Sequence, residues 1–391
     1  MNTENTIEQQ DFQAGGVAVV STAHAVHDTY TAFLPALLPV LIEKFTLTNA
    51  SAGLLSVFMQ LPSLLQPFIG HLADHANLRL LIILTPAITG TAMSLLSVAP
   101  GYGFLAFLLI LAGTSSAALH AVGPVMGSTF SGSKLGKGMS FWMVGGELGR
   151  ALGPLITVTA ISTLTLERFP WLMLAGLLTS IFLASRLHTV TTQSQENGVQ
   201  IEWRHALRKM SGLMLPLTFI IFIRSMMTAS LTTFLPIFLT SEGASLLVAG
   251  ASLTILQISG MVGAFLAGGL SDRFGRRRML VISFIATPIF MLLFLHSSSA
   301  FQIPLLILMG FFAIAVTPVI MAIVLENYPD NRSFANGVYM AISFIIQALA
   351  ILLVGFLSDL VDLRFTFMIS AGIIPFGLLV IRLLPEHTKT S

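Results

Sequence analysis

Long apolar runs separated by short polar turns make up most of this chain. A helix that crosses the hydrocarbon core of a bilayer needs about 20 mostly apolar residues, and the chain contains many runs of that length. The pattern therefore predicts an all-α polytopic membrane protein with twelve transmembrane helices. We place these spans at about 17–42, 50–72, 79–98, 103–128, 137–163, 169–187, 213–239, 246–270, 279–297, 302–326, 334–358 and 364–384.

The longest polar interval, 188–212, lies in the middle of the chain. Residues 191–198 have the composition of a soluble linker. Residues 199–210 alternate basic and apolar side chains at helical spacing, which predicts a short helix at the membrane surface. We therefore divide the chain into a cytoplasmic tail, a six-helix bundle, a cytoplasmic linker, a second six-helix bundle and a tail, at 1–16, 17–187, 188–212, 213–384 and 385–391.

The composition agrees with a membrane protein. The chain is 55% hydrophobic and 9% charged, with a mean hydropathy of +0.88, whereas soluble domains contain about 25% charged residues. It has no cysteine, which excludes disulfides and thiol chemistry. It shows no glycine-rich phosphate loop ending in Lys-Ser/Thr, no metal-ligand spacing and no long soluble segment. We therefore expect no ATP-driven pump, no enzyme, no metal or cofactor and no nucleic-acid partner.

The basic residues predict the orientation, because cytoplasmic loops carry an excess of Lys and Arg. With both termini in the cytoplasm, 14 basic residues fall inside and 3 outside, while Arg150 and Arg224 fall within spans. The inside set is Arg79, Lys134, Lys137, Arg186, Arg204, Arg208, Lys209, Arg273, Arg276, Arg277, Arg278, Arg332, Arg382 and Lys389, and the outside set is Lys44, Arg168 and Arg364.

Three short motifs recur in the same order in the two halves of the chain. A Gly-x-Leu-Ala/Ser-Asp loop occurs at 70–74 and 268–272, Phe-Leu-Pro at 33–35 and 234–236, and Ala-Val-x-Pro-Val at 121–125 and 315–319. The offsets are 198, 201 and 194 residues, always between corresponding spans. This recurrence predicts two parallel six-span repeats with a substrate pathway between them, an architecture of many secondary transporters.

The loop at 268–278, Gly-Gly-Leu-Ser-Asp-Arg-Phe-Gly-Arg-Arg-Arg, resembles the signature that the major facilitator superfamily carries after spans 2 and 8. The resemblance covers essentially the whole chain. It implies a cytoplasmic gate in which the Asp meets the end of a neighbouring helix and the Arg residues pair across the bundle. The first copy departs from the pattern, with His75 and Asn77 in place of Arg and Gly. The implied gating residues are Gly70, Asp74, Arg79, Gly268, Asp272, Arg273, Gly275 and Arg276.

Span 5 contains Gly-Arg-Ala-Leu-Gly-Pro at 149–154, which is similar to the span 5 signature of the family's proton-coupled exporters but lacks its trailing glycines. The alternative is helix packing, because small residues four apart let helices approach closely. The segments 24–30 and 33–39 in span 1, 118–124 in span 4 and 138–146 in span 5 resemble fosmidomycin-resistance-like transporters of bacterial inner membranes. This resemblance implies proton-driven efflux.

Ionisable side chains inside a membrane cost about 2.5–3.5 kcal/mol each on insertion scales, so they mark candidate functional sites. Asp28 lies near the middle of span 1, and His24 lies one helical turn earlier on the same face. We interpret them as a proton-handling pair lining the pathway, with His120 of span 4 extending the proton path. The alternative is a static hydrogen bond that ties span 1 to a neighbouring helix.

Glu147 and Arg150 are three residues apart in span 5, so they can pair within one helix. In a functional interpretation, protonation of Glu147 frees Arg150 to bind an anionic substrate. In the alternative, the pair simply neutralises itself and makes membrane insertion tolerable.

Arg224 lies near the middle of span 7 with no acidic residue within four positions, so its partner must come from another helix. A guanidinium suits carboxylate or phosphonate oxygens, which favours substrate binding; a structural pair with Asp28 or Glu147 is the alternative. Glu326, Asp359 and Asp362 fall at span ends, where we expect solvated positions. Further candidates for the substrate pathway are His27, Tyr30, Gln60, Trp142, Gln257, Tyr339 and Gln347.

The sequence thus predicts a monomeric secondary transporter of a bacterial inner membrane. It would export a small drug-like or anionic compound in exchange for protons, by rocking its two halves around a central site. Proton symport or facilitated uptake of an organic anion is the alternative on the same fold. A membrane sensor without net transport is a third reading, which the duplicated gating loops disfavour.

Overall fold

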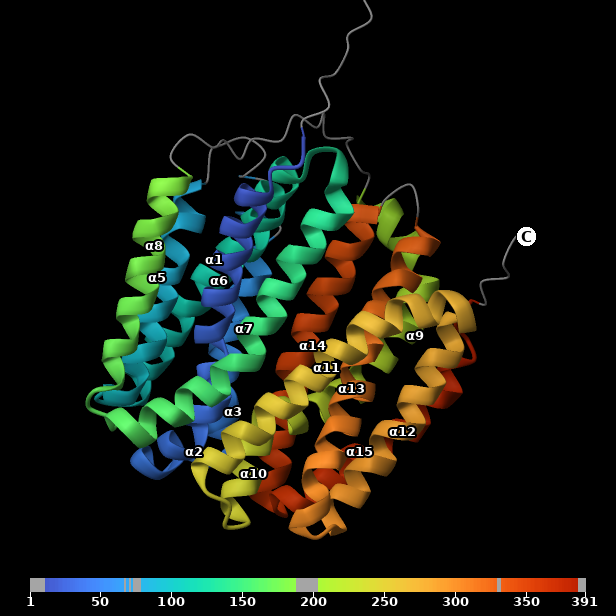
Figure 1. The fold of residues 1–391 in the computed structure, drawn as a ribbon. Coiled ribbons are helices and arrows are strands. Elements are labelled where there is room, and N and C mark those ends of the chain that lie inside the picture. The colour runs from blue at the N-terminus through green and yellow to red at the C-terminus, as the bar shows by residue number, and fades with distance from the viewer. Residues whose placement is uncertain are drawn as a thin grey trace, which may run out of the picture.

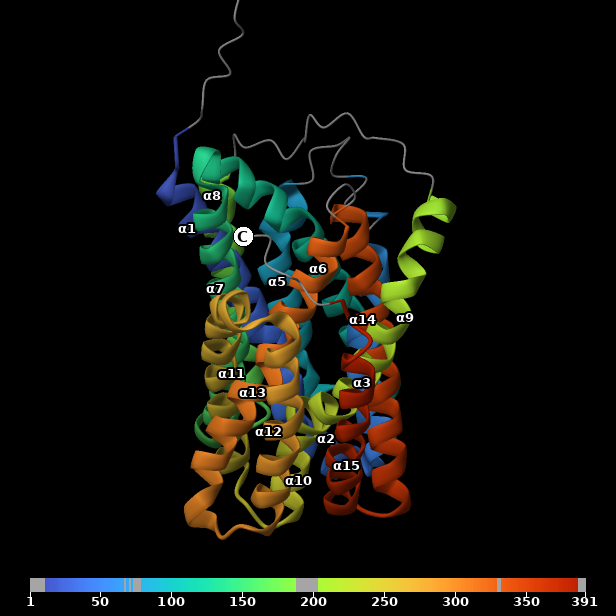
Figure 2. The same ribbon diagram turned by 90° about the vertical axis from the view of Figure 1, so that its right-hand side faces the viewer.

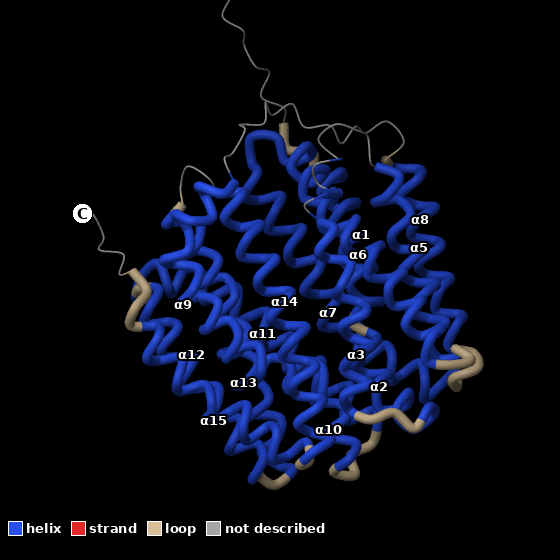
Figure 3. The backbone as a smooth tube through the Cα atoms, turned by 180° about the vertical axis from the view of Figure 1, so that it is seen from behind, coloured by secondary structure: helices blue, strands red, loops and turns tan. Residues whose placement is uncertain are grey.

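The computed structural model describes residues 11–66, 68–69, 72, 79–187, 203–328 and 332–385, and these are almost entirely helical, with no strand among them (Figures 1 and 3). The helices are α1 (Ala14–Thr31), α2 (Phe33–Phe45), α3 (Asn49–Gln60), η1 (Leu61–Leu65), α5 (Arg79–Leu95), η2 (Leu96–Val98), α6 (Tyr102–Ser131), η3 (Gly132–Lys134), α7 (Leu135–Leu164), η4 (Phe169–Leu172), α8 (Met173–Arg186), α9 (Trp203–Ala229), η5 (Ser230–Phe234), α10 (Leu235–Ser241), α11 (Leu246–Phe274), α12 (Arg276–His296), α13 (Ser299–Asn327), α14 (Arg332–Leu360) and α15 (Leu363–Ile381).

The helices form two groups that lie side by side. Figure 1 shows α1–α8 on one side and α9–α15 on the other. We call the described residues 11–187 the N-terminal group and 203–385 the C-terminal group. Helix α8 ends and α9 begins at one end of the molecule, here the linker end, whereas α2, α10 and α14 end at the opposite, far end (Figures 1 and 2).

The two groups share a hydrophobic core at the far end. The larger buried cluster joins residues such as Phe33 and Leu55 of the N-terminal group to Phe234 and Ile351 of the C-terminal group. A second cluster, which includes Val20, lies wholly within the N-terminal group. Most N-terminal members of the shared cluster come from α2 and from the parts of its neighbouring helices near the far end, so apolar packing holds the groups together there.

Helices α1 and α9 are both interrupted just before a Phe-Leu-Pro motif. The α1 helix ends at Thr31 and α2 begins at Phe33, while α9 passes through the π-helical turn of η5 before α10 begins at Leu235. Proline lacks the backbone N–H that a continuous helix needs and its ring collides with the preceding turn. Pro35 and Pro236 therefore place matching breaks in the first helix of each group.

Ten helices or joined helices among the described residues are long and apolar enough to cross a membrane. They coincide with ten of the twelve predicted spans. The predicted span 50–72 is described only as α3, η1 and a few residues beyond. The predicted span 137–163 is helical as α7, but Lys137, Glu147, Arg150 and several glycines make that helix less apolar.

The described part of the 188–212 interval differs from the predicted surface helix. Residues 203–210 form the first turns of α9, which continues without a break to Ala229. Helix α9 therefore begins about three turns before the predicted span, and residues 188–202 lie outside the described part of the chain.

Candidate coupling and substrate site

A glycine-lined face of α7 brings its polar residues against α1. A Cβ atom on Gly145, Gly149 or Gly153 would lie 2.2–2.5 Å from a backbone oxygen of α1, namely that of Ser21, Ala25 or Thr29. The spacing of four residues keeps these glycines on one helix face. The resulting close approach places Glu147 and Arg150 beside the middle of α1, where Asp28 is found.

Asp28 is 3% exposed, and nitrogen-bearing side chains from three helices surround its carboxylate. Its Oδ2 lies 3.3 Å from Nε2 of His24 on α1 and 3.7 Å from Nε of Arg150 on α7. Its Oδ1 lies 3.7 Å from Nε2 of His120 on α6. The structure thus brings together three of the predicted coupling residues, Asp28, His24 and His120, and we call this set with Glu147 and Arg150 the Asp28 cluster.

Backbone carbonyls determine which nitrogen of each histidine faces Asp28. Nδ1 of His24 lies 2.9 Å from the carbonyl oxygen of Trp142, and Nδ1 of His120 lies 2.9 Å from that of Ser116. A carbonyl only accepts hydrogen bonds, so each Nδ1 must carry a proton. In the neutral imidazoles, both Nε2 lone pairs therefore point at the Asp28 carboxylate. Three acceptors meeting in this way create a site that favours one bound cation, of which a proton is the smallest.

Trp142 fixes the orientation of His24. The two rings stack at 3.9 Å with an interplanar angle of 22°, and Trp142 is itself 4% exposed. Glycines on both sides make room, because a Cβ on Gly146 would collide with the His24 ring and one on Gly123 with the Trp142 ring. Trp142, predicted to contact substrate, is therefore packed as a support for the Asp28 cluster.

Arg150 joins the two carboxylates of the cluster. Its Nη2 pairs with Glu147 on the same helix, as the sequence spacing predicts, while its Nε faces Asp28. The side chain of Arg150 remains 45% exposed. Two carboxylates and one guanidinium leave the cluster with one uncompensated negative charge when the histidines are neutral. A single added proton would neutralise it, which lowers the cost of keeping the cluster away from water.

His24, Asp28 and His120 also satisfy a spacing that could hold a metal ion, since one ligand atom from each lies within 4.8 Å of the others. Arg150 already supplies a positive charge beside the same carboxylate. One negative charge then remains in the cluster, and a single proton is enough to neutralise it without a metal ion.

His27 belongs to a separate polar chain in the N-terminal group. It is fully buried, and its Nδ1 lies 3.1 Å from the hydroxyl of Thr89, which donates to Ser115. The ring of His27 lies 5.9 Å from that of His120. No hydrogen-bond partner is present for its Nε2 among the described residues, so His27 borders the Asp28 cluster with a free ring nitrogen.

Arg224 is held by neutral groups of α13. Its Nη2 donates to the Thr317 hydroxyl at 2.6 Å and to the Ala313 carbonyl at 3.4 Å, while its Nε has no partner among the described residues. The structure contradicts the alternative in which Arg224 pairs with Asp28 or Glu147, because those carboxylates share Arg150. Thr317 follows Val316 in the second Ala-Val-x-Pro-Val motif, which was the available signal for it in the sequence.

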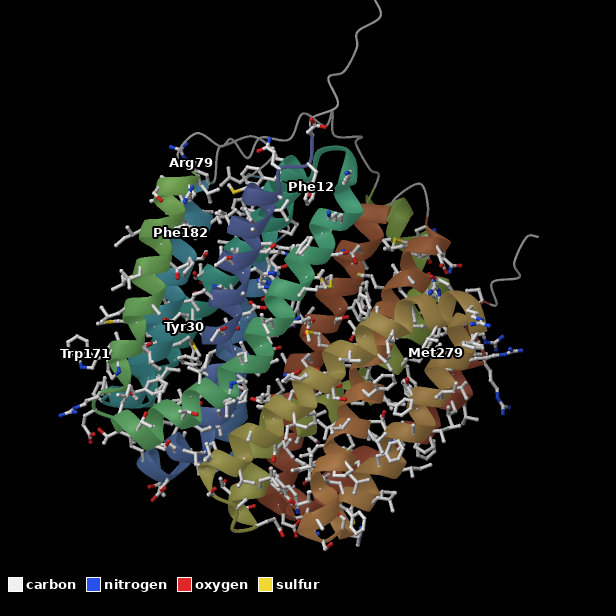
Figure 4. The ribbon with its side chains drawn as sticks, viewed as in Figure 1. Phe12, Tyr30, Arg79, Trp171, Phe182 and Met279 are labelled. Atoms are coloured by element: carbon white, nitrogen blue, oxygen red, sulfur yellow. The ribbon has the colours of Figure 1, made fainter. Side chains whose placement is uncertain are left out.

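Tyr30 lies in the N-terminal group (Figure 4), and its hydroxyl is hydrogen-bonded within that group. That hydroxyl donates to the Leu172 carbonyl at 2.5 Å and accepts from the Gly176 amide at 2.9 Å. Tyr339 is 4% exposed on α14, which packs against α9, and lies close enough to Arg224 for an electrostatic interaction. The remaining pathway candidates, Gln60, Gln257 and Gln347, are partly exposed on α3, α11 and α14.

The second gating loop is described and the first largely is not. Arg276 pairs with Asp272 and, at 2.6 Å, with Glu326 of α13, so Glu326 is not the solvated residue we expected. Gly275 separates α11 from α12 with a φ of +98°, a conformation that glycine adopts readily. Gly268 accepts a hydrogen bond from Arg276, and Arg273 lies over the Phe274 ring. Gly70 and Asp74 lie outside the described residues, and Arg79 begins α5 at the linker end (Figure 4).

Long apolar helices with charged side chains near their midpoints are typical of polytopic membrane transport proteins. The chain belongs to the Major Facilitator Superfamily, whose family model matches residues 20–264 and, in a second match, 217–391. It is therefore a transporter that crosses the membrane several times, and it is not an enzyme.

Curated relatives confirm the predicted branch. The fosmidomycin resistance protein of Escherichia coli K12 is 24% identical over 379 residues, which cover 95% of this chain and 93% of the relative. The multi-drug resistance efflux pump PmrA of Streptococcus pneumoniae TIGR4 is 24% identical over 331 residues, covering 80% of this chain and 82% of the relative. The chain resembles these proteins over most of their length.

Solved structures confirm the fold. A bacterial homologue of the human lysosomal transporter Spinster, in an inward-facing and unoccupied conformation, superimposes with a TM-score of 0.78 at 14% identity and covers 95% of this chain and 98% of its own. A D-xylose-proton symporter gives a TM-score of 0.75 at 15% identity, covering 96% and 98%. At these identities, the likeness establishes the fold alone.

Proposed function

We propose that this chain is a proton-coupled efflux transporter of a bacterial inner membrane, which exchanges protons for a small drug-like or anionic organic compound. It would work as a single chain with twelve spans and cytoplasmic termini, and it would alternate access between two six-helix halves. The Asp28 cluster carries the proposal, because it is a buried acidic site that lacks one proton. The resistance and efflux functions named for the relatives support the direction of transport.

The proposed proton site lies between the Asp28 carboxylate and the Nε2 atoms of His24 and His120. In the described geometry these atoms are 3.3 and 3.7 Å from carboxylate oxygens. A proton held there would sit near the middle of the span Ala14–Phe45, far from either surface. Its release requires the site to open to water, so the same movement that exposes the substrate would expose the proton.

The position of the bound substrate decides the sign of the coupling. A compound with a cationic or hydrogen-bond-donating group would compete with the proton for Asp28, which is the competition that exchange requires. An anion bound at Arg150 would instead favour protonation of Asp28, which couples the two in the same direction. For efflux we therefore assign an anionic group of the substrate to Arg224, whose Nε lacks a partner among the described residues.

Proton symport of an organic anion remains the alternative, and one observation favours it. Arg150 lies beside Asp28 and keeps 45% of its side chain exposed, so an incoming anion could reach it. The two functions differ in the direction of proton movement that accompanies substrate movement.

Reconstitution in liposomes that contain a pH-sensitive dye tests the proposal. With an imposed proton gradient, addition of fosmidomycin or a compound from a panel of organic anions and cationic dyes should trigger proton movement opposite to the substrate. Asp28→Asn should abolish this movement, because an amide cannot take up the proton. Asp11→Asn, which changes an exposed carboxylate in the same way, should behave like the wild type.

Proton movement that persists in Asp28→Asn would remove Asp28 from the coupling mechanism. Movement of protons and substrate in the same direction would replace efflux with symport. Substrate equilibration without proton movement would leave only facilitated diffusion.

A further inference from the structure

A carboxylate of the C-terminal group caps a helix of the N-terminal group at the far end. Asp359, at the end of α14, accepts hydrogen bonds from the backbone amides of Asn49 at 2.7 Å and Ala50 at 2.9 Å, in the first turn of α3. The amides of a first helical turn have no partner within their helix and carry a partial positive charge. Asp359 is therefore exposed, as its position at a span end led us to expect, and it is also bonded across the two groups.

The remaining first-turn donor is satisfied locally. Thr48, the N-cap residue of α3, accepts from the Ser51 amide at 3.2 Å. The helix thus has its own cap and still receives a second one from a residue more than 300 positions away. Because Thr48 already marks the helix start, the contribution of Asp359 is to connect the groups.

Glycines let α14 and α3 approach closely enough for this contact. A Cβ on Gly355, one turn before Asp359, would lie 2.8 Å from the Asn49 carbonyl oxygen. A Cβ on Gly53, one turn into α3, would lie 3.1 Å from Phe234 and 3.2 Å from Ile351. The contact surface is therefore made of small residues on both helices and ends at a charge-assisted hydrogen bond.

The residues that make this contact repeat the pattern of the gating loops. Gly355-Phe356-Leu357-Ser358-Asp359 has the Gly-x-Leu-Ala/Ser-Asp spacing found at 70–74 and 268–272. The aspartates of the second loop and of this segment make different contacts. The side chain of Asp272 is 64% exposed and pairs with Arg276 of its own group, whereas Asp359 is bonded to the opposite group.

A cavity beside the contact shows that the groups are not packed continuously at this end. It measures about 460 Å³ and is lined from the N-terminal group by Pro39, Glu43 and Asn49, and from the C-terminal group by residues that include Ile237 and Leu246. The hydrogen bonds of Asp359 therefore lie between this open space and the apolar core that the two groups share, where they add a polar contact to that packing.

We propose that Asp359 and Gly355 form a far-end latch, which closes the transport pathway on the side away from the linker by capping α3. The latch must release whenever the pathway opens to that side. The inference rests on alternating access in the proposed function, but it requires neither proton coupling nor a particular substrate. Loss of the Asp359 charge weakens the cap, so Asp359→Asn should raise the ratio of far-end-open to far-end-closed molecules by about three- to tenfold.

Spin-label distances test the latch, and the absence of cysteine lets labels be placed without removing native thiols. One label pair at exposed far-end positions, Trp171→Cys with Leu247→Cys, reports separation of the groups there. A second pair, Phe182→Cys with Phe274→Cys, reports on the linker end. In purified protein without substrate or gradient, Asp359→Asn should shift the first pair to longer distances and the second to shorter ones.

Asp362→Asn is the matched control. Asp362 lies three residues further along and caps α15 within the C-terminal group by accepting from the Phe365 amide at 2.6 Å. It loses the same charge without touching the N-terminal group. Gly355→Ala should open the far end in the same way, because the added methyl group pushes against Asn49. If Asp359→Asn does not fold, the distances are measured in Gly355→Ala instead.

Unchanged distances in both Asp359→Asn and Gly355→Ala would overturn the latch, as would an equal shift in Asp362→Asn. A transporter that fails to move protons in liposomes would still show the shift, so the latch and the proposed function can fail separately.

Discussion

At the scale of single residues, the two groups bury opposite excess charge. Asp28 and Glu147 share one guanidinium in the N-terminal group, whereas Arg224 in the C-terminal group is bonded only to neutral oxygens. A charge taken out of water without full compensation costs several kcal/mol unless a partner arrives. The uncompensated carboxylate therefore favours a proton, and the uncompensated guanidinium favours an anion.

Tyr30 gives a residue-scale prediction. Tyr30→Phe removes the acceptor of the buried Gly176 amide and the donor to the Leu172 carbonyl, which leaves both backbone groups without their partner. Leaving buried polar groups unpaired should lower the stability by ~1–3 kcal/mol each. We expect a lower melting temperature in detergent and an unchanged apparent substrate affinity.

Tyr339→Phe is the comparison, since Tyr339 lies near Arg224 and no backbone group is seen to depend on its hydroxyl among the described residues. It should weaken substrate binding with a smaller change in melting temperature. If Tyr30→Phe instead reduces affinity at constant stability, Tyr30 contacts substrate, as the sequence pattern had predicted.

Only part of the Asp28 cluster could be predicted from the sequence, and helix geometry explains which part. His24 with Asp28 and Glu147 with Arg150 are four and three residues apart, so one helical turn brings each pair together whatever the rest of the fold does. The contact of Asp28 with Arg150 depends on how α7 packs against α1. The spacing of residues along one helix says nothing about how two helices pack. From the sequence alone, Arg224 was therefore as reasonable a partner for Asp28 as Arg150.

At the scale of helices, the glycine face of α7 is the element that assembles the site. Gly145, Gly149 and Gly153 each face a backbone oxygen of α1. The packing interpretation of Gly-x-x-x-Gly therefore accounts for these residues, and the position of Arg150 follows from it. A larger side chain on this face would push α7 away from α1 and so move Arg150 away from Asp28.

Gly149→Ala tests this packing. Its new Cβ would lie 2.2 Å from the Ala25 carbonyl oxygen, so the helices must separate. Overpacking of this kind costs ~1–3 kcal/mol, and we expect a lower melting temperature together with loss of coupled transport. Gly127→Ala is the matched control, because a Cβ at that helical position has no neighbour within 4 Å, and alanine there should be neutral or stabilising by up to ~1 kcal/mol. Equal effects of the two substitutions would refute the packing argument.

Helix breaks were only partly foreseeable. The two Phe-Leu-Pro motifs mark where α1 and α9 are interrupted, because proline acts locally on the helix that contains it.

The latch at Asp359 was not foreseen, although the Gly-x-Leu-Ser-Asp pattern is visible in the sequence. Its partner is a helix start more than 300 residues away, and only the arrangement of α14 against α3 brings the two together.

At the scale of the whole molecule, Asp28 and Arg224 occupy equivalent positions. The spans that contain them begin at Ala14 and Met210 and each cover 32 residues, so both charged residues lie fourteen residues from the start. The groups share their core at the far end. A rocking movement that separates the groups at this core would change the access of both charges together, which would couple a proton on one group to a substrate on the other.

Proton release on substrate binding is the most direct test of exchange. In weakly buffered detergent solution with a pH indicator, adding fosmidomycin or another compound identified in the liposome assay should release about one proton per bound substrate, because the cluster lacks a single compensating charge. Asp28→Asn should release none. Proton uptake on binding would contradict the account and establish symport, and binding with no proton change in the wild type would remove the Asp28 cluster from coupling.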